Sequence, residues 1–235
     1  MHKATYFINT EYKKGEAIFF IYFEIRASLH LTNLHIKGPP IITMDEKLIK
    51  YFSRIMAISD EESSAIAETM CIQQYKKGTV LLKEGQVSTE VYFVLDGCVR
   101  QYFIVDGEEK TNNFFTDEQW VISVNNFNQR IPSTHFLACC IDSSLVVGNR
   151  QKEEGLYRRF PKLETVSRKV MEKVFAEQQE IMASYTIDTP EQRYLKLLKL
   201  RPDLFQKIPQ YQLASYIGVK PESLSRIRKR ITQKH

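Results

Sequence analysis

Two short helical patterns separated by a glycine occupy residues 210–230, near the end of this 235-residue chain. Leu213 and Ile217 recur at helical spacing in the first pattern, and Gly218 follows it directly. Glycine readily adopts the positive φ that a tight turn between two helices requires. The second pattern opens at Pro221, and proline suits the first turn of a helix because its missing N–H costs nothing there. The stretch therefore predicts a helix-turn-helix.

The second of these helices is expected to have one apolar and one polar side. Leu224, Ile227 and Ile231 recur at helical spacing and predict the buried side. Glu222 and Arg226 fall near its start, the part of such a helix that reaches base edges in the major groove of DNA. The polar side consists of Ser223, Ser225, Arg226, Lys229 and Arg230.

Positive charge is concentrated in the same region of the chain. Residues 188–235 contain 11 Lys and Arg against 4 Asp and Glu, a net charge of +7, whereas the whole chain carries only +5. Binding to phosphates requires such a concentration, and general solubility does not. The alternative is an ordinary αα-hairpin whose basic face is only solvated. The lopsided charge favours binding to double-stranded DNA.

Short apolar segments with regular turn signals begin at Tyr75. The pairs Asp96-Gly97 and Asp106-Gly107 lie between β-rich segments and predict hairpins. Many short strands with even turn spacing favour a β-sandwich or jelly roll. The segments expected as strands are residues 79–83, 91–95, 98–105, 110–115, 135–140 and 144–148.

Helical patterns flank the expected strands. Two helices are predicted before them, one from Asp45 and one after a capping box at Ser59, with Ile66, Ala67 and Met70 on its apolar face. A long amphipathic helix is expected to start near Pro161. Its apolar stripe is wider than one packing surface needs, which predicts self-association rather than mere cover for the strands. The stripe consists of Leu163, Val166, Val170, Met171, Val174, Phe175, Ile181 and Met182.

These patterns predict an α+β fold with an N-terminal β-roll (a double-stranded jelly roll), a long dimerisation helix and a C-terminal helix-turn-helix domain. The last domain opens with a helix from Pro190, whose core is expected to include Tyr194, Leu195, Leu197, Leu198 and Leu200. Residues 1–43 are either a genuine extension or lie upstream of a translation start at Met44. The expected boundaries are 1–43 for the extension, 44–155 for the β-roll domain, 156–187 for the long helix and 188–235 for the helix-turn-helix domain.

Several classes of protein and site are disfavoured. No apolar run approaches the ~20 residues of a membrane helix, and no signal peptide is recognisable, so a cytoplasmic protein with no membrane partner is expected. Only His135 of the five histidines lies among the expected strands, which disfavours a cupin-like metal site, small-molecule-binding barrel or enzyme. We expect no catalytic residue, no metal site and no cofactor.

The four cysteines show no metal-ligand spacing. Adjacent Cys139 and Cys140 in a strand would point to opposite faces, so they are not expected to pair with each other. Reduced, mostly buried thiols are the favoured interpretation for these two, for Cys71 and for Cys98. A redox-sensing role is the less supported alternative.

The order of these parts resembles the Crp/Fnr family of bacterial transcription regulators, from Met44 to the C-terminus. Two motifs carry the resemblance. Residues Gly78–Gly85 (GTVLLKEG) and Tyr92–Arg100 (YFVLDGCVR) look like the opening of a cyclic-nucleotide-binding β-roll, and the helix-turn-helix is the second motif. The resemblance implies a homodimer joined through the helix at residues 161–185, with each recognition helix in a major groove of a near-palindromic site. RNA polymerase is a further partner consistent with it.

The resemblance also implies roles for the C-terminal side chains. Glu222 and Arg226 match the family's base-reading glutamate and arginine, and chemically Arg226 can donate two hydrogen bonds to guanine while Glu222 accepts one from cytosine. The family's further arginine is replaced by Pro221, so a different preferred site is expected. Ser223 and Ser225 would reach phosphates or bases. Backbone contacts are implied for Lys220, Arg228, Lys229 and Arg230.

The expected effector pocket departs from the family. Its cyclic-nucleotide binders carry a Gly-Glu pair and an Arg-Ser/Thr-Ala segment, whereas residues 120–136 contain neither, and Arg130 is the only cation nearby. A buried phosphate without a paired cation or several N–H donors is strongly disfavoured, so tight cAMP binding is not expected. The effector is unknown, and its expected pocket is Trp120, Arg130, Ser133 and Thr134. The alternative is a nucleotide-responsive regulator with an atypical phosphate site near Arg130.

Overall fold

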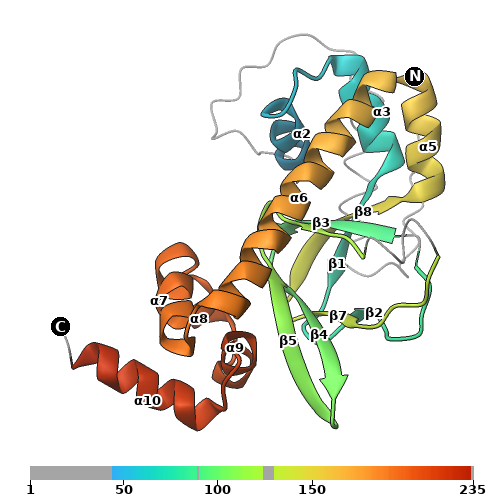
Figure 1. Ribbon diagram of the computed structural model, residues 1–235. Coiled ribbons are helices and arrows are strands. Elements are labelled where there is room, and N and C mark those ends of the chain that lie inside the picture. The colour runs from blue at the N-terminus through green and yellow to red at the C-terminus, as the bar shows by residue number, and fades with distance from the viewer. Residues whose placement is uncertain (1–43, 89, 124–129, 234–235) are drawn as a thin grey trace, which may run out of the picture. The chain divides into compact units, whose positions relative to one another are not determined.

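The computed structural model describes residues 44–88, 90–123 and 130–233 (Figure 1), so the expected N-terminal extension lies outside the described residues. Residues 42–235 form one compact unit. The N-terminal helices are α2 (Met44–Ser53) and α3 (Asp60–Thr69). The strands are β1 (Cys71–Tyr75), β2 (Val80–Leu82), β3 (Glu90–Asp96), β4 (Val99–Val105), β5 (Glu108–Phe115), β6 (Trp120–Val121), β7 (Phe136–Cys139) and β8 (Ser143–Asn149). The C-terminal helices are α5 (Arg150–Arg159), α6 (Pro161–Ile187), α7 (Pro190–Leu200), α8 (Leu204–Lys207), α9 (Gln210–Ile217) and α10 (Pro221–Thr232).

The strands form two antiparallel sheets, in the orders β1-β8-β3-β6 and β2-β7-β4-β5. Apolar side chains from both sheets, among them Leu82, Val94, Leu137 and Leu145, pack together as the interior of the roll. The predicted α+β fold with an antiparallel jelly roll is therefore confirmed. The first strand, β1, begins at Cys71, earlier than the expected change of pattern, and the two-residue β6 was not predicted.

The two Asp-Gly pairs have different structural roles. Asp106 and Gly107 both have positive φ and join β4 to β5 as a two-residue hairpin, as predicted. The prediction of a hairpin at Asp96-Gly97 is wrong, because β3 and β4 lie in different sheets. Gly97 has a φ of +116°, and a Cβ there would lie 2.3 Å from the Ser143 Oγ. Glycine is needed at this position for the chain to cross closely over β8.

The N-terminal helices and the first half of α6 cover the outer face of the β1-β8-β3-β6 sheet. Leu48, Ile66, Phe93 and Val166 share one buried cluster there, together with Trp120. The predicted capping box is present, with reciprocal hydrogen bonds between Ser59 and Glu62. Ile66 is buried as expected and Met70 is partly buried, but Ala67 is exposed and Ala65 is buried in its place.

The long helix begins at Pro161, as its apolar pattern predicted, whereas the expected domain boundary at residue 156 falls inside another helix. Residue 156 lies inside α5, and α6 begins at Pro161 after the chain turns at Phe160. Figure 1 shows α6 running from the N-terminal helices to α7. Within the described ranges, no helix is long and apolar enough to span a bilayer.

Only one side of α7 is buried. Tyr194 and Leu197 are in the core as predicted. The same prediction is wrong for Leu195, Leu198 and Leu200, which are 41%, 40% and 75% exposed. The helix packs through a single face against the other C-terminal helices, so leucines off that face stay in solvent although helix propensity favours them there.

Candidate nucleic-acid interface and sensor pocket

The turn between α9 and α10 has the predicted geometry. Gly218 ends α9 with a φ of +80°, and the Val219 N–H donates to the Ala214 carbonyl at 2.9 Å. Pro221 is in the first turn of α10. Leu224 and Ile227 of α10 are buried with Leu213, Ala214 and Ile217 of α9, and Ile231 packs at the edge of this cluster. The C-terminal helices fit the expected helix-turn-helix.

The residues predicted to bind DNA lie mostly in solvent. Arg226 is exposed and forms no ion pair with a described residue, whereas Arg230 is paired with Glu191 of α7 at 3.0 Å. The Ser225 hydroxyl donates to the Pro221 carbonyl within the helix, and Ser223 is half-buried. The remaining predicted residues, all exposed, are Lys220, Glu222, Arg228 and Lys229.

One arginine connects the long helix to the C-terminal helices. The Arg193 Nε donates to the Ile217 carbonyl at the end of α9 at 2.8 Å, and its Nη1 donates to the Asp188 carbonyl at 2.6 Å. Its guanidinium lies over the Tyr185 ring, and the Tyr185 hydroxyl donates to the Tyr216 carbonyl. A single side chain thus links the ends of α6 and α9 to α7.

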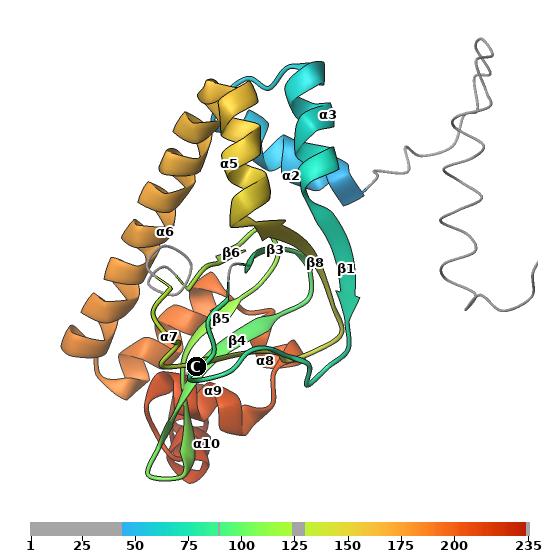
Figure 2. The same ribbon diagram turned by 90° about the vertical axis from the view of Figure 1, so that its right-hand side faces the viewer.

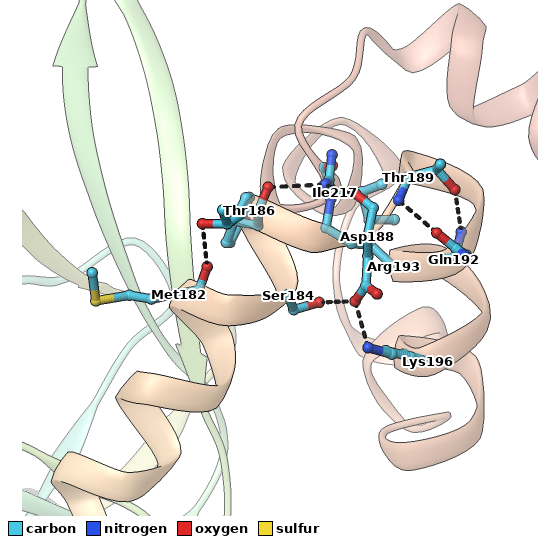
Figure 3. Close-up of polar contacts among 10 residues, drawn as sticks. Met182, Ser184, Thr186, Asp188, Thr189, Gln192, Arg193, Lys196 and Ile217 are labelled. Atoms are coloured by element: carbon cyan, nitrogen blue, oxygen red, sulfur yellow. Dashed lines mark hydrogen bonds and ion pairs between the residues drawn. The ribbon is translucent and has the colours of Figure 1, made fainter.

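Polar groups fix the chain where α6 gives way to α7 (Figure 3). The Asp188 carboxylate accepts hydrogen bonds from Lys196 and Ser184, each at 2.5 Å. The hydrogen bond from Lys196 is the main reason that the pKa of Asp188 lies below its ordinary value. Thr189 and Gln192 form a capping box at the start of α7. That T-x-x-Q spacing was readable in the sequence, whereas nothing local marks Arg193 as a connection between helices.

A further set of bonds, here called the sheet–helix contact, joins β5 to the C-terminal helices. The Ser215 hydroxyl accepts from the Thr111 N–H at 2.9 Å and donates to the Glu109 carbonyl at 3.0 Å. Arg201 donates to the carbonyl of Phe114 at 2.8 Å and to the hydroxyl of Thr116. Figures 1 and 2 both show α9 beside the β4–β5 hairpin. The β2-β7-β4-β5 sheet and the C-terminal helices are therefore in direct contact.

Three of the four predicted pocket residues line one cavity. Trp120, Ser133 and Thr134 border a space of about 260 Å³, together with Val174 and Gln178 of α6. The Ser133 hydroxyl is already engaged, since it donates to the backbone carbonyl of His135.

The cavity has no cation among its described lining residues. Arg130 is exposed and is not one of them, and His135 has its pKa lowered by burial, so its imidazole is neutral at pH 7. Within the described residues, no group of three or more potential ligands could hold a metal ion. The described residues that line the cavity therefore carry mainly uncharged polar groups and aromatic rings.

Comparisons with known proteins agree with this architecture. Residues 72–159 match the cyclic nucleotide-binding domain family. CLP from Xanthomonas campestris, described as a c-di-GMP responsive global regulator, has a similar structure with a TM-score of 0.60, at 14% identity over 75% of this chain and 93% of that one. A Crp/Fnr family transcriptional regulator from Eubacterium rectale gives 0.60 at 16% identity, over 79% of this chain and 88% of that one. FixK2 from Bradyrhizobium japonicum gives 0.57 at 17% identity, over 70% and 85% of the two chains.

No curated protein is significantly similar to this chain in sequence. The family match spans the roll and α5, and the structural similarity extends over most of the described chain. The chain therefore carries a domain of the cyclic nucleotide-binding family at residues 72–159, within the fold of the Crp/Fnr regulators.

Proposed function

We propose that the protein is a sequence-specific DNA-binding transcription regulator of the Crp/Fnr type, acting as a homodimer in the cytoplasm. The observation that carries the proposal is the exposed polar side of α10, which follows a well-packed turn and concentrates the positive charge of the chain. A helix presented in this way fits the major groove of B-DNA. The similar structures from E. rectale and X. campestris are themselves described as regulators.

The roles proposed for the α10 side chains follow their exposure. Arg226 is free to donate two hydrogen bonds to a guanine, and Glu222, one turn earlier, is placed to accept from a cytosine. Ser223 and Ser225 lie on the same helix, and their short side chains are proposed to contact phosphates or bases. Phosphate contacts, which set affinity rather than sequence preference, are assigned to Lys220, Arg228, Lys229 and Arg230.

The dimer is proposed from the second half of α6. Leu163, Val166 and Val170 pack against the roll, but Phe175 and Met182, seven residues apart, are 65% and 64% exposed. Two large apolar side chains on one face of a helix favour a partner helix, as in a coiled coil. RNA polymerase remains a predicted further partner.

The effector is proposed to bind in the cavity beside α6 and to be a molecule other than cAMP. Since the described lining is uncharged, a cyclic phosphate placed there would lose its hydration without gaining a cation. Titration calorimetry with cAMP should therefore show no binding at micromolar concentrations. Micromolar affinity would overturn this prediction and would favour the alternative phosphate site near Arg130, Ser133 and Thr134.

Selection of bound sequences from random double-stranded DNA tests the function. The proposal predicts enrichment of a two-fold symmetric motif whose half-sites lie about one helical turn apart. A control selection in high salt should retain the motif and lower the yield, because phosphate contacts weaken as counterions are added. Recovery of unenriched DNA at every salt concentration would contradict the proposal.

A further inference from the structure

Two cysteines face each other across neighbouring strands of the β2-β7-β4-β5 sheet. The ladder between β4 and β7 pairs Val99 with Cys139, and the Cys140 N–H continues it by donating to the Cys98 carbonyl at 2.8 Å. Directly opposite residues of an antiparallel pair project to the same face, with their Cα atoms about 4.5–5.5 Å apart. Disulfides span Cα separations of about 4.4–6.8 Å. The backbone at Cys98 and Cys140 therefore suits a disulfide.

Strand alternation places the thiols of Cys139 and Cys140 in different clusters. Cys139 belongs to the interior of the roll, which confirms that the adjacent cysteines point to opposite faces. Cys98 and Cys140, 0% and 4% exposed, belong to the same apolar cluster as Leu204 and Ile208 of the C-terminal helices. The facing pair thus lies under the sheet–helix contact.

The surroundings make the two thiols unequal. The interaction between the two thiols raises the pKa of Cys98 and lowers the pKa of Cys140, and burial opposes the second shift. The nearby guanidinium of Arg100, itself buried, lowers the pKa of Cys140 further. Because the thiolate is the nucleophile in thiol oxidation, Cys140 is the residue placed to react first.

We propose that Cys98 and Cys140 form a reversible disulfide when the protein meets hydrogen peroxide, and that this bond weakens the sheet–helix contact. The Cys140 thiolate attacks one peroxide oxygen, the O–O bond breaks, and a sulfenic acid and hydroxide result. The Cys98 thiol then attacks the sulfenic sulfur, the S–O bond breaks, and water leaves with the Cys98 proton. The pair loses two electrons and two protons in total, and one peroxide becomes two waters.

Access to the pair requires movement of the helices that cover it. Arg201 and Ser215 hold those helices on β5 through side-chain hydrogen bonds. Loss of one of these bonds should expose the thiols more often and speed their oxidation. Formation of the S–S bond requires the two sulfurs, which lie in the same apolar cluster as Leu204 and Ile208, to shift to bonding distance. Since tightly packed contacts tolerate little displacement, the helices that position α10 should dock less firmly.

Peptide mapping tests the bond directly. The full-length protein carrying Cys71→Ser and Cys139→Ala retains only the facing pair. After peroxide treatment, blocking of free thiols and tryptic digestion, peptides Glu84–Arg100 and Ile131–Arg150 should appear linked, lighter by two hydrogen atoms than their sum. Dithiothreitol should release them, and Arg201→Ala should accelerate the linkage. If the double variant does not fold, fragmentation of the wild-type peptide between Cys139 and Cys140 assigns the link instead.

The expected effect of the disulfide on DNA affinity rests on the proposed function and is measured separately from peptide mapping. Peroxide should lower affinity for the selected DNA site by about 5-fold or more, a coupling of about 1 kcal/mol, and dithiothreitol should restore it. The Cys98→Ser variant should keep its affinity after the same treatment. Oxidation of Cys98 and Cys140 to separate acids without a link, or an equal loss of affinity in Cys98→Ser, overturns the proposal. Absence of specific binding by the reduced protein overturns the proposed function alone, because peptide mapping still decides whether the disulfide forms.

Discussion

Replacing Arg226 with alanine should lower the affinity of the protein for its selected DNA site by about 30-fold or more. A bidentate contact between arginine and guanine contributes about 1–3 kcal/mol of discrimination, and both half-sites of a dimer lose it together. The Arg226 side chain is exposed and forms no ion pair with a described residue, so its removal should leave the fold unchanged. Fluorescence anisotropy with the selected duplex and with a scrambled duplex measures both the affinity and the sequence preference.

Lys199→Ala is the matched control for this experiment. Lys199 lies exposed on α7, and its replacement removes the same charge from the same group of helices. It should weaken binding to the selected and scrambled duplexes to the same small extent, since a distant charge acts only through the general field. Arg226→Ala should instead reduce the difference between the affinities for the selected and the scrambled duplex. Equal behaviour of the two variants would show that Arg226 contributes charge alone and does not read bases.

Local signals were sufficient to predict the turn between α9 and α10. The positive φ of Gly218 and the place of Pro221 in the first turn of α10 depend on a few neighbouring residues, and the structure has both as expected. The hairpin at Asp106-Gly107 succeeded for the same reason. Where residues close in sequence determine the conformation, spacing and residue type suffice.

Contacts between distant segments were not predictable in this way. The Asp-Gly signal at residues 96–97 is chemically the same as the one that succeeded, but the packing of Gly97 against Ser143 sends the chain into the other sheet. In the sequence, Arg193 and Arg201 contributed only to the net charge. In the structure, each donates a hydrogen bond to a backbone carbonyl of a distant helix or strand. The facing of Cys98 and Cys140 depends on the register of β4 against β7, which strand patterns alone do not determine.

The double replacement Phe175→Glu with Met182→Glu should convert the protein from a dimer to a monomer at micromolar concentration. Both side chains are about two-thirds exposed within one subunit, so glutamate there costs the monomer little and helix propensity is kept. In a helix pair the four new carboxylates would be buried opposite one another, which is strongly unfavourable. Light scattering after size-exclusion chromatography measures the mass, and thermal unfolding followed by circular dichroism confirms the fold.

Loss of the dimer should also lower DNA affinity by about 100-fold or more, because the second half-site is no longer held at high effective concentration. Ala176→Glu is the matched control: it introduces the same side chain at the next exposed position of α6, about 100° around the helix from Phe175. This variant should remain dimeric and keep its affinity.

A dimer that persists in the double variant would place the interface elsewhere. A monomer that still binds the palindromic site with full affinity would separate DNA recognition from dimerisation. Val174 and Gln178, neighbours of Phe175 on the same helix, line the cavity proposed for the effector, so a ligand there would act directly on the helix that these substitutions test.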